Sequence, residues 1–260
     1  MGATEFINNR IRWCLWLKDA SPAQIRAVPP VMDAIAKVHE MRAGSSRTGT
    51  RKLANTPTLF GEIRQPNFNY LLVPCHSSEN RRYSPLGYIE PSVICGNANL
   101  MVPSANLYHF GVLTSSAHMA WMRAVAGRLK SDYRYSANIV YNNFPWPEGD
   151  DGTNGTTETD ATGTTATVDG ASHSSCQSHI SHDLCAAISS TAQAILDTRA
   201  RYPDASLADL YDPLTMPSDL RAAHAANDRA VLAAYGLAPG TPESEIVAHL
   251  FRLYAEATAK

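Results

Sequence analysis

The chain has 260 residues, of which 44% are hydrophobic and 18% are charged, and its formal net charge is −2. That length can bury a substantial core and predicts one large domain or two small ones. The most apolar run, residues 13–17, is too short for a membrane span and no cleavable signal precedes it, so we expect a soluble, cytoplasmic protein.

Charge is divided unevenly along the chain. Residues 1–148 hold 16 Lys and Arg against 9 Asp and Glu, a net +7, and residues 149–260 hold 6 against 15, a net −9. A basic half favours a polyanionic partner, because each neutralised phosphate releases condensed counterions, and an acidic half is repelled from that partner. The alternative is that both halves simply have charged, solvated surfaces.

The N-terminal segment predicts one strand and two helices. RWCLWLKD, residues 12–19, favours a strand. A helix is expected after Ser21, because Ser is a good N-cap, Pro22 suits the first helical position, and a Gln two residues further on can return the capping-box bond. The pair Pro29-Pro30 breaks this segment, and a second amphipathic helix follows over residues 31–40.

Two loops supply candidate phosphate contacts. GSSRTGTRK, residues 44–52, mixes small hydroxylated residues with three cations, and SSENRRY, residues 77–83, places two arginines together in a turn. For both loops the alternative is an ordinary solvated turn. The candidate phosphate-binding residues of these loops are Arg47, Arg51, Lys52, Arg81 and Arg82.

Between residues 59 and 113 the pattern predicts short strands punctuated by Pro, Gly and Asn. We place these strands at residues 62–63, 70–73, 86–89, 100–102 and 110–113.

A long amphipathic helix is predicted after Ser115 or Ser116, either of which can act as N-cap. Apolar side chains then recur at helical spacing as far as residue 129. Arg123 and Arg128 lie outside this apolar stripe, so we expect a basic face and include both residues among the candidate phosphate contacts.

A strand is predicted from Asp132 onward. There the period changes to two, so that Asp132 and Arg134 point one way and Tyr133 and Tyr135 point the other. The prolines of NNFPWPE, residues 142–148, then stop any ladder, because proline has no N–H to donate to it.

The rest of the chain predicts a linker and a helical unit. Residues 149–178 contain no aromatic residue, no Lys and no Arg, so they cannot bury enough apolar surface to order themselves and are expected to be a flexible Thr/Gly-rich acidic linker. Beyond them, helices are predicted at residues 184–196, 206–212, 220–235 and 242–254. The expected fold class is α+β: a mixed α/β domain with short strands and a long amphipathic helix, followed by a small all-α unit.

The sequence offers no complete active site. His173, Cys176, His179, His182 and Cys185 have spacings that suit zinc, but no second half-site completes a tetrahedron, so we expect no metal. An odd number of cysteines at irregular spacings predicts reduced thiols.

Residues 143–147, NFPWP, differ in order from the Asn-Pro-Pro-aromatic signature with which adenine methyltransferases hold a flipped base, because here the Asn precedes Phe. We interpret them as a structural closure. No Gly-rich turn for a nucleoside cofactor and no Walker loop is present, and no catalytic residue is predicted.

Five separated blocks resemble one known family. In chain order they are GATEFINNRIRWCLWLKDASPAQIRAVPPV, RKLANTPTLFGEIRQP, YLLVPCHSSENRRYSPLGYI, ANLYHFGVLTSSAHMAWMRAVAGRLKSDYRYSANIVYNNFPWPE and SLADLYDPLTMP. Together they resemble the target recognition domain and C-terminal helical domain of MmeI-like (YeeA-like) adenine-specific DNA methyltransferases, many of them type II restriction–modification fusions. The resemblance implies a DNA target-recognition domain over residues 1–148, the linker over 149–178, and a C-terminal helical domain over 179–260.

The resemblance also implies a function. The chain would recognise double-stranded DNA for a methyltransferase domain that it does not contain, present in cis upstream or supplied in trans, and S-adenosylmethionine would bind in that missing domain. Whether the whole protein is the methyltransferase depends on the sequence upstream of Met1. The alternative function is an acidic helical protein-interaction module next to a basic domain that binds phosphates without sequence preference.

In such enzymes a few positions vary with the target sequence. Arg134 can donate two bonds to guanine, Asp132 can accept one from cytosine, and Asn97 can bond adenine through both amide atoms. An Asp132–Arg134 ion pair on a solvated strand is the alternative for two of them. The chain departs from the family at Cys75-His76, where relatives carry Arg or a similar polar residue, and in its longer linker. The implied base-reading residues are Cys75, Asn97, Ala98, Lys130, Asp132 and Arg134.

Overall fold

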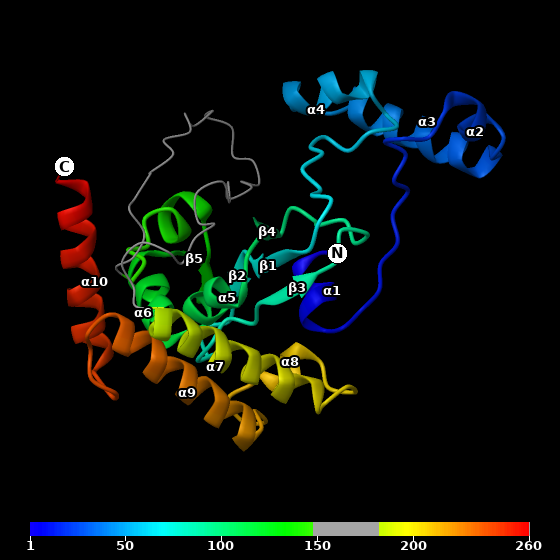
Figure 1. Cartoon of the computed structure of the whole chain (residues 1–260). Coiled ribbons are helices and arrows are strands. Elements are labelled where there is room, and N and C mark those ends of the chain that lie inside the picture. Colours follow the sequence, from blue (N-terminus) through cyan, green and yellow to red (C-terminus); the bar gives the residue numbers. More distant parts are fainter. Residues whose placement is uncertain (148–181, 260) are drawn as a thin grey trace. The chain divides into compact units, whose positions relative to one another are not determined.

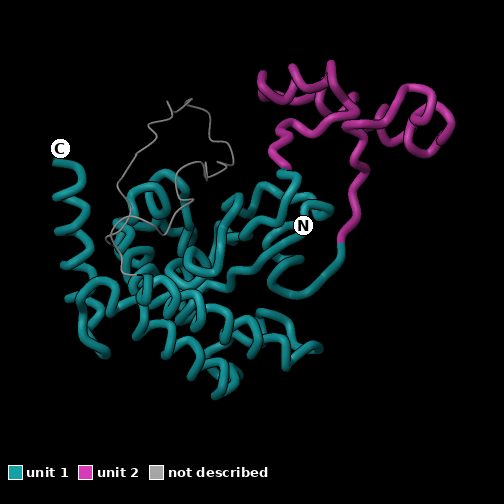
Figure 2. The backbone as a smooth tube through the Cα atoms, in the orientation of Figure 1, with its two compact units in different colours: residues 1–11, 66–260 teal, residues 12–65 magenta. Residues whose placement is uncertain are grey.

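The computed structural model describes residues 1–147 and 182–259. The predicted linker, residues 149–178, therefore lies outside the described residues. The chain divides into two compact units: unit 1 comprises residues 1–11 and 66–260, and unit 2 comprises residues 12–65 (Figure 2).

Unit 2 is helical, and its first two helices confirm the sequence-based prediction. In α2 (Pro22–Arg26) the expected capping box is formed, because Ser21 Oγ accepts from Gln24 N at 3.3 Å and Gln24 Oε1 accepts from Ser21 N at 2.8 Å. α3 (Pro29–Ala43) begins at the proline pair, whose missing N–H groups are not needed in a first turn. A short α4 (Thr48–Lys52) and a 3₁₀ turn (Leu53–Asn55) follow.

Two predicted strands of unit 2 are wrong. Residues 12–17 and residues 62–63 have no regular secondary structure. A strand requires a neighbouring backbone to pair with, and the two sheets of the described chain contain neither segment. Residues 53–59, which follow the basic loop, are held by Arg42 instead. Its guanidinium donates to the carbonyl oxygens of Leu53, Thr56 and Leu59 at 2.8–3.0 Å.

The first sheet of unit 1 is antiparallel, with the order β3-β1-β4. Its strands are β1 (Tyr70–Pro74), β3 (Gly87–Ile89) and β4 (Asn99–Pro103), which confirms three of the predicted strands. The central strand β1 is buried on both faces: Leu71 and Val73 contribute to the main core, and Tyr70 and Leu72 pack in a second cluster with Phe6 of α1 (Ala3–Ile7). Such a strand appears in the sequence as a continuous apolar run.

The second sheet has the order β2-β6-β5. Its strands are β2 (His76–Ser77), β5 (Gly127–Leu129) and β6 (Asp132–Arg134). Lys130 and Ser131 form the two-residue loop of the β5–β6 hairpin, with Lys130 at φ 56°, because such loops match the twist of the strands only with a positive φ.

Residues 107–125 form two helices, although a strand followed by one long helix was predicted in this part of the chain. Residues 110–113 were expected to be a strand but belong to α5 (Leu107–Leu113), which Asn106 caps by accepting from His109 N at 3.1 Å. A short apolar run cannot be assigned to strand or buried helix from periodicity alone. α6 (Ser116–Val125) is capped by Ser115 as predicted, but it ends before residue 129, because the chain turns into the β5–β6 hairpin.

The C-terminal helices share a core with the sheets. They are α7 (His182–Ala200), α8 (Leu207–Leu210), α9 (Ser218–Ala234) and α10 (Glu243–Thr258), and all four predicted helices are present. α7 and α9 lie side by side (Figure 1), and one hydrophobic cluster joins Phe110 and Trp121 to Ile188, Leu220 and Leu250. The fold is α+β, as predicted, and unit 1 is stabilised from both ends of the chain.

Candidate nucleic-acid interface

Strand β6 presents the last group of predicted base-reading residues. Tyr133 is 7% exposed and Tyr135 is 4% exposed, whereas Arg134 between them is exposed to solvent. This confirms the predicted alternation. Asp132 is half-buried at the start of the strand, and Lys130 is exposed in the hairpin loop. The outer face of the hairpin therefore carries two cations.

Cys75 connects this hairpin to the other predicted residues. Its N–H donates to the carbonyl of Ala98 at 3.0 Å, and its own carbonyl accepts from Tyr135 N at 2.8 Å. The Cys75 backbone is therefore hydrogen-bonded on one side to the loop of Asn97 and Ala98 and on the other side to the residue that follows β6. Three segments far apart in the sequence meet at one surface.

The Cys75 thiol is neutral at this surface. Burial raises its pKa to about 11, although the nearby Arg134 guanidinium acts in the opposite direction. A neutral thiol is a weak hydrogen-bond donor and behaves mainly as a small apolar group. The charge of this part of the surface therefore comes from Arg134.

The guanidinium of Arg134 makes no ion pair and no side-chain hydrogen bond with any other described residue. The alternative predicted from the sequence, an Asp132–Arg134 ion pair, is not formed. Asp132 instead accepts a long bond of 3.4 Å from the backbone N–H of Glu79, through one of its two carboxylate oxygens. Arg134 is therefore free to donate to a ligand.

Arg128, predicted to bind phosphate, is engaged within the hairpin. Its Cζ lies 3.7 Å from the centre of the Tyr133 ring, its Nη1 donates to Ser131 O at 2.7 Å, and the same atom is 3.7 Å from Glu79 Oε2. These contacts connect β5 to β6 and to the loop of Glu79. The Arg128 side chain therefore stabilises the hairpin.

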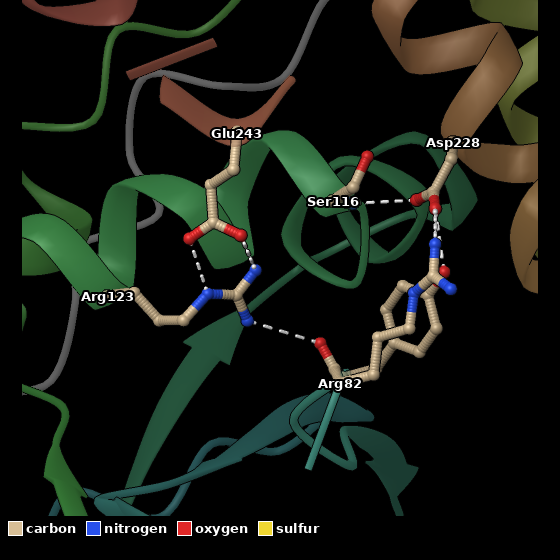
Figure 3. Close-up of polar contacts among 6 residues, drawn as sticks. Arg82, Ser116, Arg123, Asp228 and Glu243 are labelled. Carbon is tan, nitrogen blue, oxygen red and sulfur yellow. Dashed lines mark hydrogen bonds and ion pairs between the residues drawn. The ribbon is translucent and has the colours of Figure 1, made fainter. Parts of the chain in front are cut away.

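Arg123, also predicted to bind phosphate, is engaged within the protein. It forms a two-bond pair with Glu243 at the start of α10, from Nε to Oε1 at 2.7 Å and from Nη2 to Oε2 at 2.9 Å (Figure 3). Its Nη1 donates to the carbonyl of Arg82 at 3.4 Å. The Arg123 side chain is 22% exposed, and each of its three nitrogens donates to a protein acceptor. It therefore links α6 to α10 and to the arginine loop, residues 77–83.

The arginine loop is held by a second acidic residue of the C-terminal helices. Tyr83 OH donates to Asp228 Oδ2 at 2.6 Å, and Asp228 Oδ1 accepts from Ser116 N at 2.7 Å (Figure 3). Burial raises the pKa of Asp228, and the hydrogen bonds from Tyr83 and Ser116 and the positive charge of Arg82 partly oppose this shift. The Arg82 side chain is 4.0 Å from this carboxylate and 67% exposed, so its guanidinium can still meet a phosphate.

Arg81 is half-buried in the same loop. Burial lowers its pKa, and the carboxylates of Asp132 and Asp212 partly offset that effect. The charge of Arg81 is therefore favoured by acidic residues of both the hairpin and the loop before α9.

The remaining predicted phosphate contacts belong to unit 2. Arg51 donates to the carbonyl oxygens of Ser45 and Ser46, both at 2.9 Å, and so orders the start of α4. The side chains of Arg47 and Lys52 are exposed, and neither makes an ion pair with a described residue. These two are the available cations of this loop.

No group of three or more His, Cys, Asp or Glu in the described ranges is arranged to hold a metal ion. Most of the zinc-like spacing, including His173 and Cys176, lies outside those ranges. Cys185 is disulfide-bonded, so the prediction of reduced thiols is wrong at this residue. Cys14, Cys75 and Cys95 are thiols, as predicted. None of the described helices is both long and apolar enough to cross a membrane.

One residue of this surface was missed from the sequence. His76 of β2 lies directly opposite Arg134 of β6. A two-residue strand carries no periodicity, so nothing in the sequence indicates where it pairs. The only available signal was the unusual Cys75-His76 pair within an otherwise family-like block.

Comparison with known families defines the class of the chain: a target recognition domain followed by a C-terminal domain, which is helical in this structure. The chain belongs to the MmeI family. Residues 1–148 match the MmeI target recognition domain and residues 181–260 match the MmeI C-terminal domain, which confirms the resemblance seen in the sequence.

Two relatives are similar over the whole chain. DNA methyltransferase A of Bacillus subtilis (strain 168) is 35% identical over 260 residues, which are 100% of this chain and 26% of that protein. The solved structure of the type IIL restriction–modification enzyme MmeI in complex with DNA is 42% identical with a TM-score of 0.85, over 100% of this chain and 31% of that one. The chain thus spans less than a third of each protein.

Proposed function

We propose that this chain recognises the base sequence of double-stranded DNA for an adenine-specific, S-adenosylmethionine-dependent methyltransferase of a type II restriction–modification system. The observation that carries the proposal is the exposed Arg134, which has no side-chain partner among the described residues and stands beside Cys75 and the loop of Asn97 and Ala98. Membership of the MmeI family supports it, since one relative is named a DNA methyltransferase and another was solved with DNA.

A β-hairpin such as β5–β6 is one of the elements that can read bases in the major groove. The major groove of B-DNA is about 12 Å wide and admits a two-stranded β-ribbon, and each base pair presents a distinct pattern of donors and acceptors there. With β5–β6 in the groove, Arg134 donates two bonds to guanine, Asn97 pairs with adenine, and the second oxygen of Asp132 accepts from cytosine. Each good pair contributes about 1–3 kcal/mol of discrimination.

Cations outside the hairpin supply affinity without sequence preference. Arg82 has a largely exposed side chain, and Arg47 and Lys52 are exposed in unit 2. Each phosphate contact that is removed should weaken binding to all sequences alike and reduce the dependence on salt by about one counterion.

The methyl transfer itself belongs to a domain outside this chain, in cis or in trans, and we place the complex in the cytoplasm. S-adenosylmethionine would supply the methyl group in that domain. Among the described residues, the strand-to-helix connection from β4 to α5, residues 104–106, has no glycine to allow close approach of a nucleotide-like ligand.

The proposal is tested by selecting duplexes from a randomised library with the purified chain, at about 50 mM and at about 200 mM salt. We expect one short asymmetric motif to be enriched at both concentrations. Binding that disappears at the higher salt without any motif would contradict base recognition by this chain, because phosphate contacts alone behave in that way.

A further inference from the structure

We infer that His76 is a further specificity-determining residue, which donates a hydrogen bond to the base pair next to the one contacted by Arg134. The inference rests on the proposed function, because it assigns a role within the same surface. His76 was not among the base-reading residues that the sequence implied, although the Cys75-His76 pair departs from the family pattern.

The pairing of β2 with β6 places the two side chains together. His76 and Arg134 are direct partners in the antiparallel register. The bond from Tyr135 N to Cys75 O closes the neighbouring pair, so His76 and Arg134 form a pair without mutual backbone hydrogen bonds. In such pairs the Cα atoms are about 4.5 Å apart and the side chains are at their closest.

Both side chains lie on the outer face of the sheet. Directly paired residues share a face, and the next pair along, Ser77 and Tyr133, is buried, with exposures of 4% and 7%. His76 is half-buried and makes no side-chain hydrogen bond or ion pair with a described residue. Its ring is thus not required to satisfy a partner inside the protein.

The other side of Arg134 is open. Gly127 of β5 pairs with Arg134 across the hairpin, and a Cβ added at Gly127 would meet nothing within 4 Å. The row across the sheet therefore consists of His76, Arg134 and Gly127, and the last of these has no side chain. A base edge that approaches Arg134 meets His76 on one side and no side chain on the other.

This spacing fits adjacent base pairs. The Cα atoms of the pair are about 4.5 Å apart, and successive base pairs are about 3.4 Å apart along the duplex. An imidazole N–H can donate to the major-groove acceptors O6 and N7 of guanine or O4 of thymine. We therefore expect His76 to favour a guanine or thymine edge next to the base contacted by Arg134.

The test compares base preferences, position by position, for the full chain carrying His76→Ala and for the unchanged chain, in the same library selection. His39→Ala is the matched control, because His39 is an exposed histidine of α3 outside this sheet. We expect His76→Ala to reduce discrimination about fivefold at one base pair adjacent to the position relaxed by Arg134→Ala, with other positions and the control unchanged.

Three outcomes would overturn the inference. Unchanged preferences in His76→Ala would make His76 a spectator, and equal weakening on all sequences would make it a phosphate contact. If the unchanged chain enriches no motif, the proposed function itself fails. If His76→Ala lowers the melting temperature, His76→Gln is used in its place. Glutamine keeps a hydrogen-bond donor and should shift the preference at that base pair toward adenine. An unshifted preference in His76→Gln would also contradict the inference.

Discussion

At the scale of single residues, the environment of each arginine decides what it can bind. Arg128 stacks on Tyr133 and Arg123 is paired with Glu243, so both guanidinium groups are used inside the protein. Arg134 has no such partner among the described residues. One side-chain type thus braces the hairpin, links helices and presents donors to a ligand, according to the acceptors around it.

The pairing of Arg123 with Glu243 can be measured by a double-mutant cycle. We expect Arg123→Ala and Glu243→Ala each to lower the free energy of unfolding, and the double variant to lose less than their sum by about 0.5–1 kcal/mol, because Glu243 is 51% exposed and solvent screens the pair. Urea unfolding of the four proteins gives this coupling. Additive losses would show that the pair contributes nothing to stability.

Two buried histidines predict a loss of stability in mild acid. Burial lowers the pKa of His118 to about 3, and burial with Arg199 and Arg82 lowers that of His224 well below its ordinary value. Below about pH 6.5 both imidazoles are protonated in the unfolded chain but not in the folded chain. Because the unfolded state then binds more protons, the free energy of unfolding falls as the pH falls. The expected decrease is about 1 kcal/mol per pH unit for each histidine.

Urea unfolding at pH 7.5, 6.5 and 5.5 tests this effect. His118→Gln is the informative variant, because it removes one of the two titrating groups and should roughly halve the dependence on pH. A free energy of unfolding that is constant over this range would contradict the burial of the two imidazoles.

At the scale of the elements, the contact between α5 and α7 depends on a glycine. A Cβ at Gly111 would lie 2.7 Å from Ile188 Cγ2 and 3.0 Å from Asn227 Oδ1. The Asn227 side chain of α9 also donates to the carbonyl of Gly111 at 2.7 Å, so α5 is bonded to α9 as well as packed against α7. The C-terminal helices are therefore packed directly against the target-recognition part of the chain.

Gly111→Ala should consequently lower the free energy of unfolding by about 1–3 kcal/mol, because the extra methyl group overpacks this contact. Gly49→Ala is the matched control: Gly49 lies in helix α4 with nothing within 4 Å of an added Cβ, and alanine there should be neutral or stabilising by up to about 1 kcal/mol. Thermal unfolding of both variants decides the point. Equal melting temperatures would show that α7 can move away from α5.

The sequence predicted those elements whose signals are local. The capping box of Ser21 and the alternation of β6 involve neighbours in the chain, and both are confirmed. Residues 12–17 have strand-like composition but no backbone to pair with, and residues 110–113 form a buried helix whose apolar run resembles a strand. Predictions failed where a distant partner decides the local structure.

The same distinction applies to the site. The exposure of Arg134 follows from alternation within one strand and was predicted. The contacts of Arg123 with Glu243 and of Tyr83 with Asp228, and the pairing of His76 with Arg134, join residues far apart in the sequence. No local pattern indicates such contacts, so the sequence showed which residues are cationic but not which are available.

At the scale of the whole molecule, the acidic half of the chain stabilises the basic half. Asp228 and Glu243 of the C-terminal helices hold the loop of Arg82 and the side chain of Arg123. Some acidic residues of the second half and some basic residues of the first half therefore form ion pairs and hydrogen bonds with each other inside unit 1. This arrangement favours a supporting role for the C-terminal helices over an independent protein-interaction module.

Removing residues 182–260 should therefore unfold the target-recognition part. The truncated chain would expose Phe110 and Trp121, which pack in the same core as Ile188 and Leu250. We expect loss of cooperative thermal unfolding and of the near-ultraviolet circular dichroism of the buried aromatic residues. A truncated chain that unfolds sharply and still binds DNA would contradict the shared core and favour separate duties for the two halves.

The central claim is that the outer face of the β2-β6-β5 sheet recognises bases, and it is tested most directly by comparing Arg134→Ala with Arg82→Ala in the library selection. We predict that Arg134→Ala relaxes one base position, with a loss of about 1–3 kcal/mol on the preferred sequence, whereas Arg82→Ala weakens all sequences alike and lowers the salt dependence. An equal loss on every sequence from Arg134→Ala would contradict the claim and reduce this surface to a phosphate-binding face.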